Sequence, residues 1–346
     1  MINMEKRADY DLAFLLRYEN VAWYNEGKVR ILDRRIYPIE TRFVECTSHR
    51  EVAQAIANMV TQSYGPYTAA AMGMVLAAYE AKGMSYERRM EHLRDAAYTL
   101  SHARPTTSAK MERIVNGAVA LAEKCEDSAL VDTLFEYAFR KIDDTYKSYI
   151  SVGKYLAELI PDGGTVMTQC YADTVIGTTL RALRESGKTA KFICPETRPY
   201  FQGSRLTASV ICDMGFDVTV ISDNMPAYVL NKKKVDLFTS AADVITVDGH
   251  VVNKVGTLQI ALAAHYWGIP YFVTGNPDPA HKDISRITIE ERNSEEVLHA
   301  REIKVTMDGV KGYYPAFDIT PPNLCCGVVT DKGVLPPYCL NKYFED

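Results

Sequence analysis

Hydrophobic and polar residues follow a helical period through the first 145 or so residues of the chain. The clearest stretch is residues 85–103, an amphipathic pattern that stops before Arg104-Pro105, as a helix should before proline. Around Pro38 the residues alternate between apolar and polar instead, which predicts a short hairpin over residues 28–46. Further helical stretches are expected at 51–82, with an interruption at Tyr64-Gly65-Pro66, and at about 108–159.

The second half of the chain has a different pattern, in which short apolar runs alternate with helical stretches of about ten residues. The expected strands are 165–168, 190–194, 217–221, 244–247 and 271–273, and the expected helices are 174–186, 204–214 and 257–265. This alternation predicts a doubly wound parallel sheet of Rossmann-like type with helices on both faces. We therefore expect a helical domain with a small β-hairpin at 1–145 and an α/β domain at 146–346. The site should lie between them, beyond the carboxyl ends of the strands.

Composition narrows the classes of protein that this chain can be. Its 346 residues carry a formal net charge of −5 and no basic block longer than Lys232-Lys233-Lys234, so no nucleic-acid partner is expected. No run of about 18 apolar residues occurs, so no membrane span is expected either. The N-terminal residues lack the apolar core of a signal peptide, and a cytoplasmic location is the default expectation.

The eight cysteines and seven histidines form no metal-binding motif. The cysteine spacings match no zinc motif, and neither a His-x-x-His nor a Cys-x-x-Cys pair occurs. We therefore expect no metal site, and cysteines that are mostly buried free thiols. The second half also lacks the Gly-x-Gly-x-x-Gly and phosphate-loop motifs, which argues against a dinucleotide or nucleoside triphosphate cofactor.

Two residues near predicted strands could transfer protons. Cys170 follows a strand and leads into a helix, where the partial positive charge of helix N–H groups lowers a thiol pKa. A buried cysteine that only packs is the alternative. Asp243 could cap a turn, but in a dry cleft beside a thiol its pKa would rise and it could transfer a proton near neutral pH.

Other segments could bind an anion or hydroxyl groups. Asn253 and Lys254 precede a predicted helix, a position suited to a phosphate or a hydroxyl. Gln202 lies in a loop rich in donors, although such loops are usually solvated surface. Arg104 could clamp a phosphate with its planar fork, or it could simply meet the dipole of the preceding helix.

Taken together, these segments resemble the methylthioribose-1-phosphate isomerase family, which is related to ribose-1,5-bisphosphate isomerases and to the regulatory alpha, beta and delta subunits of the translation-initiation exchange factor. The resemblance covers almost the whole chain. The blocks that carry it best are VRILDRRIYPIETRFVEC (29–46), LRDAAYTLSHARPTT (93–107), VMTQCYADTVIGTTLRAL (166–183), PETRPYFQGSRLTASVICDMGFDVTVISDNM (195–225), AADVITVDGHVVNKVGTLQIALAAHYWGIPYFV (241–273), ITIEERNSEEV (287–297) and YYPAFDITPPNLCCGVVTDKGVLPP (313–337).

The resemblance implies roles for particular residues. The catalytic cysteine and aspartate of the isomerases fall on Cys170 and Asp243. Their substrate-binding residues fall on Arg104, Gln202, Asn253 and Lys254. The family's Arg-Gly-Ala-Pro-Ala stretch is replaced by a sequence that contains Gln62, Tyr64 and Gly65, so its arginine is absent and a reshaped loop over the pocket is expected. Asp173, close to Cys170 in sequence, would raise the thiol pKa if the two side chains are near.

The resemblance implies an aldose–ketose isomerase without cofactor, a homodimer that acts on a sugar phosphate. It would convert a 5-substituted ribose 1-phosphate, with a methylthio or deoxy group at C5, to the ribulose 1-phosphate, as in methionine salvage. The alternative is a non-catalytic protein that senses a sugar phosphate or nucleotide, like the exchange-factor subunits. The absent arginine favours this alternative, whereas the paired Cys170 and Asp243 favour the enzyme.

Overall fold

A helix buried on almost every side, α3 (Gly65–Glu80), is the centre of the first half of the protein. The computed structural model describes residues 7–104, 108–232 and 234–345, in two units, Met1–Lys147 and Ser148–Asp346. In the first unit α3 packs against four other helices and a small sheet. Its alanine and glycine residues permit this close approach: a side chain at Gly73 would lie 2.9 Å from Leu100 Cδ2.

The other elements of the first unit follow the expected helical pattern. The helices are α1 (Tyr18–Val21), α2 (His49–Ala57), α4 (Tyr86–Ser101), α5 (Ser108–Ala122) and α6 (Leu130–Leu159), which continues into the second unit. The predicted hairpin is present as β2 (Lys28–Leu32) and β3 (Phe43–Cys46), but β1 (Ala22–Asn25) also pairs with β2, which makes an antiparallel sheet of three strands. The division into domains at 1–145 and 146–346 stays a prediction.

The second unit is a sheet of six parallel strands with one antiparallel strand at its edge. Its parallel strands are β4 (Gly164–Met167), β5 (Ala190–Pro195), β6 (Asp217–Ile221), β7 (Leu237–Ala241), β10 (Tyr271–Thr274) and β14 (Gly327–Thr330), and the edge strand is β15 (Gly333–Leu335). In space the parallel strands run β6-β5-β4-β7-β10-β14. This is the order of a doubly wound Rossmann-like sheet, as the sequence predicts.

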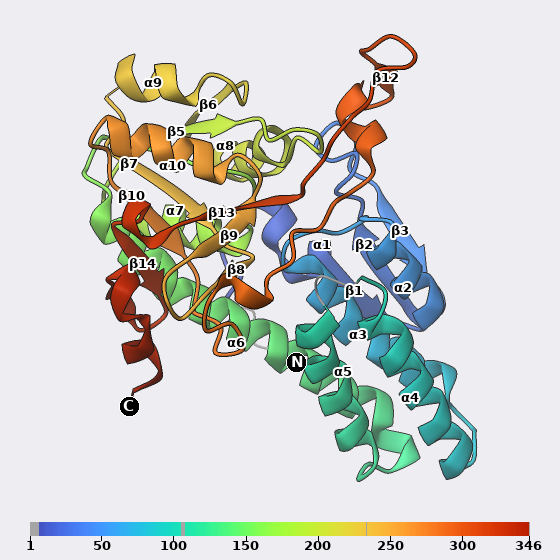
Figure 1. Ribbon diagram of the computed structural model, residues 1–346. Coiled ribbons are helices and arrows are strands. Elements are labelled where there is room, and N and C mark those ends of the chain that lie inside the picture. Colours follow the sequence, from blue (N-terminus) through green and yellow to red (C-terminus); the bar gives the residue numbers. More distant parts are fainter. Residues whose placement is uncertain (1–6, 105–107, 233, 346) are drawn as a thin grey trace. The chain divides into compact units, whose positions relative to one another are not determined.

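Helices cover both faces of this sheet. On one face, α9 (Pro226–Lys232) and α10 (Thr257–Tyr266) pack together over a core that includes Met167, Phe238 and Val273 (Figure 1). On the other face lie helix α7 (Thr174–Glu185) and the C-terminal end of α6. Together with Thr168, Thr239 and Thr274, which follow directly after the three core residues named above, they line a cavity of about 10 Å³. Side chains of successive strand residues point to opposite faces, which explains this division.

One predicted strand of the sheet is wrong. Residues 244–247 were expected to be a strand of this sheet, but the strand between β4 and β10 is β7. Of residues 244–247, only β8 (Val244–Ile245) is a strand, and it belongs to a separate antiparallel sheet with β9 (Val251–Lys254) and β13 (Phe317–Thr320). The predicted helix at 204–214 also differs, since it begins as a π-helical turn, η5 (Gly203–Thr207), before α8 (Ala208–Asp213).

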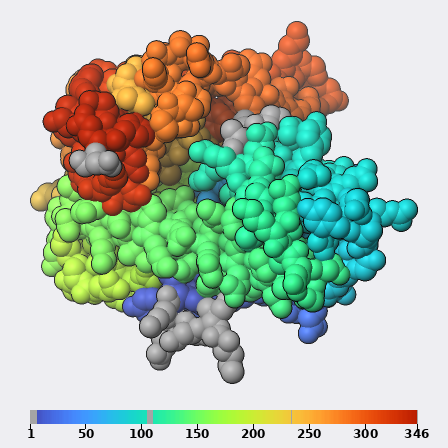
Figure 2. Space-filling view, turned by 90° about the horizontal axis from the view of Figure 1, so that it is seen from below, coloured from blue at the N-terminus to red at the C-terminus, as the bar shows by residue number. Residues whose placement is uncertain are grey.

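The remaining segments are short and lie mostly after β10. They are the 3₁₀ turns η2 (Phe14–Leu16), η4 (Asp127–Ala129), η6 (Ile284–Arg286), η7 (Ser294–Leu298), η8 (Pro322–Leu324) and η9 (Pro337–Phe344), and the hairpin of β11 (His299–Ala300) and β12 (Ile303–Lys304). The C-terminal residues lie on the surface (red in Figure 2). Among the described helices, none combines the length and apolar character that crossing a bilayer requires.

Candidate active site

Strand order fixes where a ligand crevice can form in the second unit. From β4 the chain winds outward in one direction through β5 and β6, and from β7 it winds in the other direction through β10 and β14. Strands β4 and β7 are parallel neighbours at this reversal, where helices on opposite faces leave a crevice beyond the carboxyl ends of the strands. Cys170 follows β4 and Asp243 follows β7, so the topology brings these two predicted residues to the same place.

Cys170 lies in a tight loop between β4 and α7. Its φ of 58° is in the left-handed region, which is uncommon for a residue other than glycine. The hydroxyl of Thr207, at the end of η5, donates a hydrogen bond to the backbone carbonyl of Cys170. The loop therefore holds the partly buried Cys170 in a defined conformation beyond the end of β4.

The surroundings of Cys170 keep its thiol protonated at neutral pH. Burial raises the pKa of the thiol to about 11, an effect that the positive charge of Lys254 opposes and the negative charge of Asp243 reinforces. Arg292 also lowers this pKa. Asp173 instead accepts a hydrogen bond of 3.0 Å from the hydroxyl of Tyr171, and Asp243 is the carboxylate whose charge raises the thiol pKa.

Asp243 lies between the end of β7 and the start of β8. Its backbone N–H donates to the carbonyl of Val252, 2.9 Å away, which joins the end of β7 to the small antiparallel sheet. Its side chain is exposed in the single chain. The Cys170 thiol and the Asp243 carboxylate are close enough to interact electrostatically, and a catalytic role for Asp243 stays a prediction.

Asn253 and Lys254, at the end of β9, are both buried. The amide of Asn253 donates to the hydroxyl of Thr257, 3.0 Å away, at the start of α10. The ammonium of Lys254 lies 3.4 Å from the hydroxyl of Tyr314 and 4.9 Å from the centre of the Phe317 ring. A desolvated ammonium held against aromatic rings is well suited to bind an anion strongly.

Arg292 and Tyr314 belong to this site, and the sequence analysis gave neither a role. The Arg292 side chain is 9% exposed, forms an ion pair of 2.8 Å with Glu290, and lies 5.5 Å from the centre of the Phe317 ring. Burial raises the pKa of Tyr314 to about 12, and Tyr314 also interacts with Cys170. Arg292 lies in the block ITIEERNSEEV (287–297), but its spacing from Cys170, more than a hundred residues, gives no sign that the two interact.

Two buried glutamines lie at the carboxyl ends of β4 and β5. Gln202 immediately precedes η5, and its Oε1 is buried without a hydrogen-bond partner in the described part of the chain. The Oε1 of Gln169 is likewise buried without a hydrogen-bond partner among the described residues, while its Nε2 donates to the carbonyl of Val255 at 3.3 Å. A buried amide oxygen without a partner costs roughly 1–3 kcal/mol, so Gln202 has an acceptor available for a ligand hydroxyl.

The other predicted site residues lie in the first unit. Tyr64 is buried at the start of α3, and its hydroxyl donates to Thr145 Oγ1 at 2.8 Å. Gly65 has no room for a side chain, since a Cβ there would lie 1.8 Å from Thr61 Oγ1. Arg104 follows α4 and is partly buried, and the next two residues of its Arg-Pro-Thr motif are outside the described residues. A role for Tyr64, Gly65 or Arg104 in the same site as Cys170 stays a prediction.

The second unit is thus a doubly wound α/β sheet with a thiol, a carboxylate and two cations near the carboxyl ends of β4 and β7. The initiation factor 2 subunit family matches residues 62–337. The chain is 37% identical to methylthioribose-1-phosphate isomerase 1 of Pseudothermotoga lettingae, covering 89% of this chain and 92% of that protein. The chain belongs to the methylthioribose-1-phosphate isomerase family, which confirms the resemblance seen in the sequence.

Solved structures give the same result for the fold. The crystal structure of 5-methylthioribose 1-phosphate isomerase from Pyrococcus horikoshii OT3 superposes with a TM-score of 0.87 at 31% identity, covering 97% of both chains. The translation initiation factor eIF-2B subunit delta from A. fulgidus gives a TM-score of 0.80, also at 31% identity, over 92% of this chain and 96% of that chain. The predicted fold class is confirmed.

Proposed function

We propose that this protein is an aldose–ketose isomerase that converts a 5-substituted ribose 1-phosphate to the ribulose 1-phosphate, with S-methyl-5-thioribose 1-phosphate as the first candidate substrate. The observation that carries the proposal is the meeting of Cys170, Asp243 and Lys254 at the crevice between β4 and β7. Relatives named as methylthioribose-1-phosphate isomerases, which match most of the chain, support the choice of substrate.

The phosphate on C1 prevents spontaneous opening of the sugar ring, so the enzyme must protonate the ring oxygen. Asp243 is the proposed acid, and it later receives the proton from the C2 hydroxyl as the ketone forms. The hydrogen on C2 then moves to C1 in one of two ways. Either Cys170 removes it as a proton through an enediol, or it shifts as a hydride while Cys170 acts on a hydroxyl or by electrostatics.

The thiol pKa of about 11 favours the hydride route. A general base works best when its pKa is near the operating pH, and this thiol is almost entirely protonated at pH 7. The protonated thiol can still donate a hydrogen bond to a substrate oxygen.

We expect turnover in deuterium oxide to yield ketose without deuterium at C1, because a hydride shift exchanges nothing with solvent. Mass spectrometry of the product measures this directly. Deuterium incorporation at C1 would instead assign the base role to Cys170.

The binding residues divide by the chemistry of their partners. Lys254 and Arg104 hold the phosphate, Gln202 and Asn253 orient sugar hydroxyls, and Tyr64 with Gly65 borders the C5 substituent. Arg292 adds positive charge beside Cys170 and supports the developing oxyanion. We further propose that the enzyme is a cytoplasmic homodimer that acts in methionine salvage.

The assignment of Cys170 and Asp243 is tested by Cys170→Ser and Asp243→Asn. Each should lower kcat by at least about 10²-fold. Asp243→Asn removes the proposed proton-transfer group, which typically contributes 10²–10⁴-fold, and Cys170→Ser removes the thiol that both routes for the C2 hydrogen use. Cys212→Ser, an exposed cysteine on α8, is the matched control and should keep full activity. Circular dichroism and Tm establish that the variants remain folded. Unchanged activity in either site variant would contradict its assignment.

A non-catalytic sensor is the second candidate function, and the structural match to the eIF-2B delta subunit favours it. Incubation with methylthioribose 1-phosphate, 5-deoxyribose 1-phosphate and ribose 1,5-bisphosphate separates the two. Ketose formation from any of them supports the enzyme and defines the C5 substituent. Binding of all three without turnover supports the sensor.

A further inference from the structure

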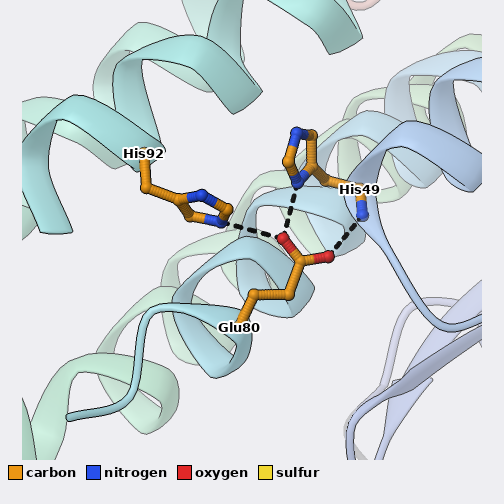
Figure 3. Close-up of side chains that lie close together, drawn as sticks. All are labelled: His49, Glu80 and His92. Carbon is orange, nitrogen blue, oxygen red and sulfur yellow. Dashed lines mark hydrogen bonds and ion pairs between the residues drawn. The ribbon is translucent and has the colours of Figure 1, made fainter. Parts of the chain in front are cut away.

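Two histidines and a glutamate converge in the first unit, and none of the three has a role in the proposed chemistry (Figure 3). His49 is the first residue of α2, Glu80 is the last residue of α3, and His92 lies within α4. His49 Nδ1 and His92 Nε2 lie 2.6 Å and 2.8 Å from the same carboxylate oxygen, Glu80 Oε2. The three potential ligand atoms lie within 4.8 Å of one another, and no other such group of three occurs among the described residues.

The environment of Glu80 directs one of its oxygens toward both rings. The other oxygen, Oε1, accepts a hydrogen bond of 2.7 Å from the backbone N–H of His49. A glutamate carboxylate is ionised at neutral pH, and Oε2 of Glu80 lies between the two rings. Its Oε2 is therefore an anionic ligand whose orientation is already fixed.

His49 has an unsatisfied atom on the other side of its ring. Its side chain is 3% exposed, and the buried Nε2 makes no hydrogen bond within the described residues. The nearest acidic group is Asp95, whose Oδ2 lies 3.8 Å away and also pairs with Arg50 at 2.6 Å. If a neutral His49 carries its proton on Nδ1, its Nε2 points a lone pair at the Asp95 carboxylate. Two acceptors then face each other, which is unfavourable.

We propose that His49 Nδ1, Glu80 Oε2 and His92 Nε2 bind a divalent transition metal ion, for which Zn²⁺ is the best match. Two imidazole nitrogens and one carboxylate oxygen are a common zinc ligand set, with water as the fourth ligand. The Glu80 and His92 side chains are 18% and 23% exposed, which leaves a path for the ion and the water.

Metal binding would give His49 Nε2 a hydrogen-bond partner. Coordination through Nδ1 moves the proton of His49 to Nε2, where an N–H group faces Asp95. A ligand histidine that donates its second N–H to a carboxylate is the usual arrangement around protein-bound zinc. At tetrahedral bond lengths the ligand atoms would be about 3.3 Å apart, so the rings and the carboxylate need only adjust around their present positions.

The ion would join three helices and act as a structural link. The sequence predicts no metal site because His49 and His92 are 31 and 12 positions from Glu80, on separate helices, and form no motif. The ion has no part in the isomerisation that we propose, so its presence can be tested without measuring activity.

The test begins with full-length protein freed of metal by a chelator that is then removed. Adding Zn²⁺ should raise Tm by several degrees and bind one ion per chain in calorimetry, since a ligand that binds only the folded state stabilises it. Co²⁺ in the same site should give the visible absorption bands of a four-coordinate ion.

Two variants make the result specific. His92→Gln keeps a group that can hydrogen-bond to Glu80 but removes the ligand nitrogen, and it should lose both the rise in Tm and the cobalt bands. His265→Gln on α10, outside the cluster, should retain both. If Zn²⁺ leaves the Tm of the wild type unchanged, or if His92→Gln binds as well as wild type, the cluster is only a hydrogen-bond network and the proposal is overturned.

Discussion

At the scale of single residues, charges of opposite sign act on the pKa of one thiol, that of Cys170. Lys254 and Arg292 favour the thiolate, whereas burial and Asp243 oppose it, and the opposing effects prevail. The sequence can identify Cys170, Asp243 and Lys254 by resemblance, because each lies in a block that matches the family's pattern. It cannot identify Arg292, whose contribution depends on the path of a long segment after β10.

The alkylation of Cys170 by iodoacetamide should keep accelerating as the pH rises toward about 11, because the thiolate is the reactive form. Asp243→Asn should shift this profile to lower pH, since it removes a negative charge, and Arg292→Gln should shift it to higher pH. Mass spectrometry of the labelled peptide separates Cys170 from the other cysteines. Arg286→Gln, an exposed arginine, is the control and should leave the profile unchanged. A midpoint near 8.5 in the wild type would contradict this description.

At the scale of elements, helix α3 shows how small residues specify packing. Gly73→Ala would favour the helix by up to about 1 kcal/mol on propensity alone. The new methyl group would lie 2.9 Å from Leu100 Cδ2, however, and overpacking typically costs about 1–3 kcal/mol. We therefore expect lower stability in urea unfolding. Leu100→Val should recover part of the loss when combined with Gly73→Ala, and strictly additive effects of the two substitutions would contradict the proposed contact.

Strand β7 was not predicted from the sequence, because its residues lack the apolar pattern of a buried strand. Its residues Thr239 and Ser240 are polar, yet both are buried at the centre of the sheet. The hydroxyl of Thr239 donates to the carbonyl of Phe272 at 2.8 Å, and that of Ser240 lies 2.7 Å from the hydroxyl of Tyr271. Because neighbouring strands satisfy these hydroxyls, burial costs little. Residues 244–247 have the stronger strand pattern, but only two of them form a strand.

At the scale of the whole molecule, the surface of the second unit leaves large apolar side chains exposed. Tyr228 on α9 and Leu262 and Tyr266 on α10 are 69%, 53% and 77% exposed, and these two helices pack together. Extended exposed apolar surface is uncommon on a monomer, which supports the proposed homodimer.

We expect multi-angle light scattering of the purified protein to give twice the chain mass of 38.8 kDa. Tyr266→Ser is a useful comparison, since weakening of the dimer would assign this surface to the interface. A mass equal to a single chain at micromolar concentration would contradict the homodimer.

The pairing of β9 with β13 has a consequence for how the protein is made. Phe317 pairs with Lys254 and Asp318 pairs with Asn253, and Asp318 also accepts hydrogen bonds from backbone N–H groups at the start of α10. The walls around the ammonium thus come from a strand that is translated some sixty residues after it. A nascent chain has the sequence for β4, β7 and the thiol loop early, but the surroundings of the proposed anion-binding ammonium are complete only when synthesis is nearly finished.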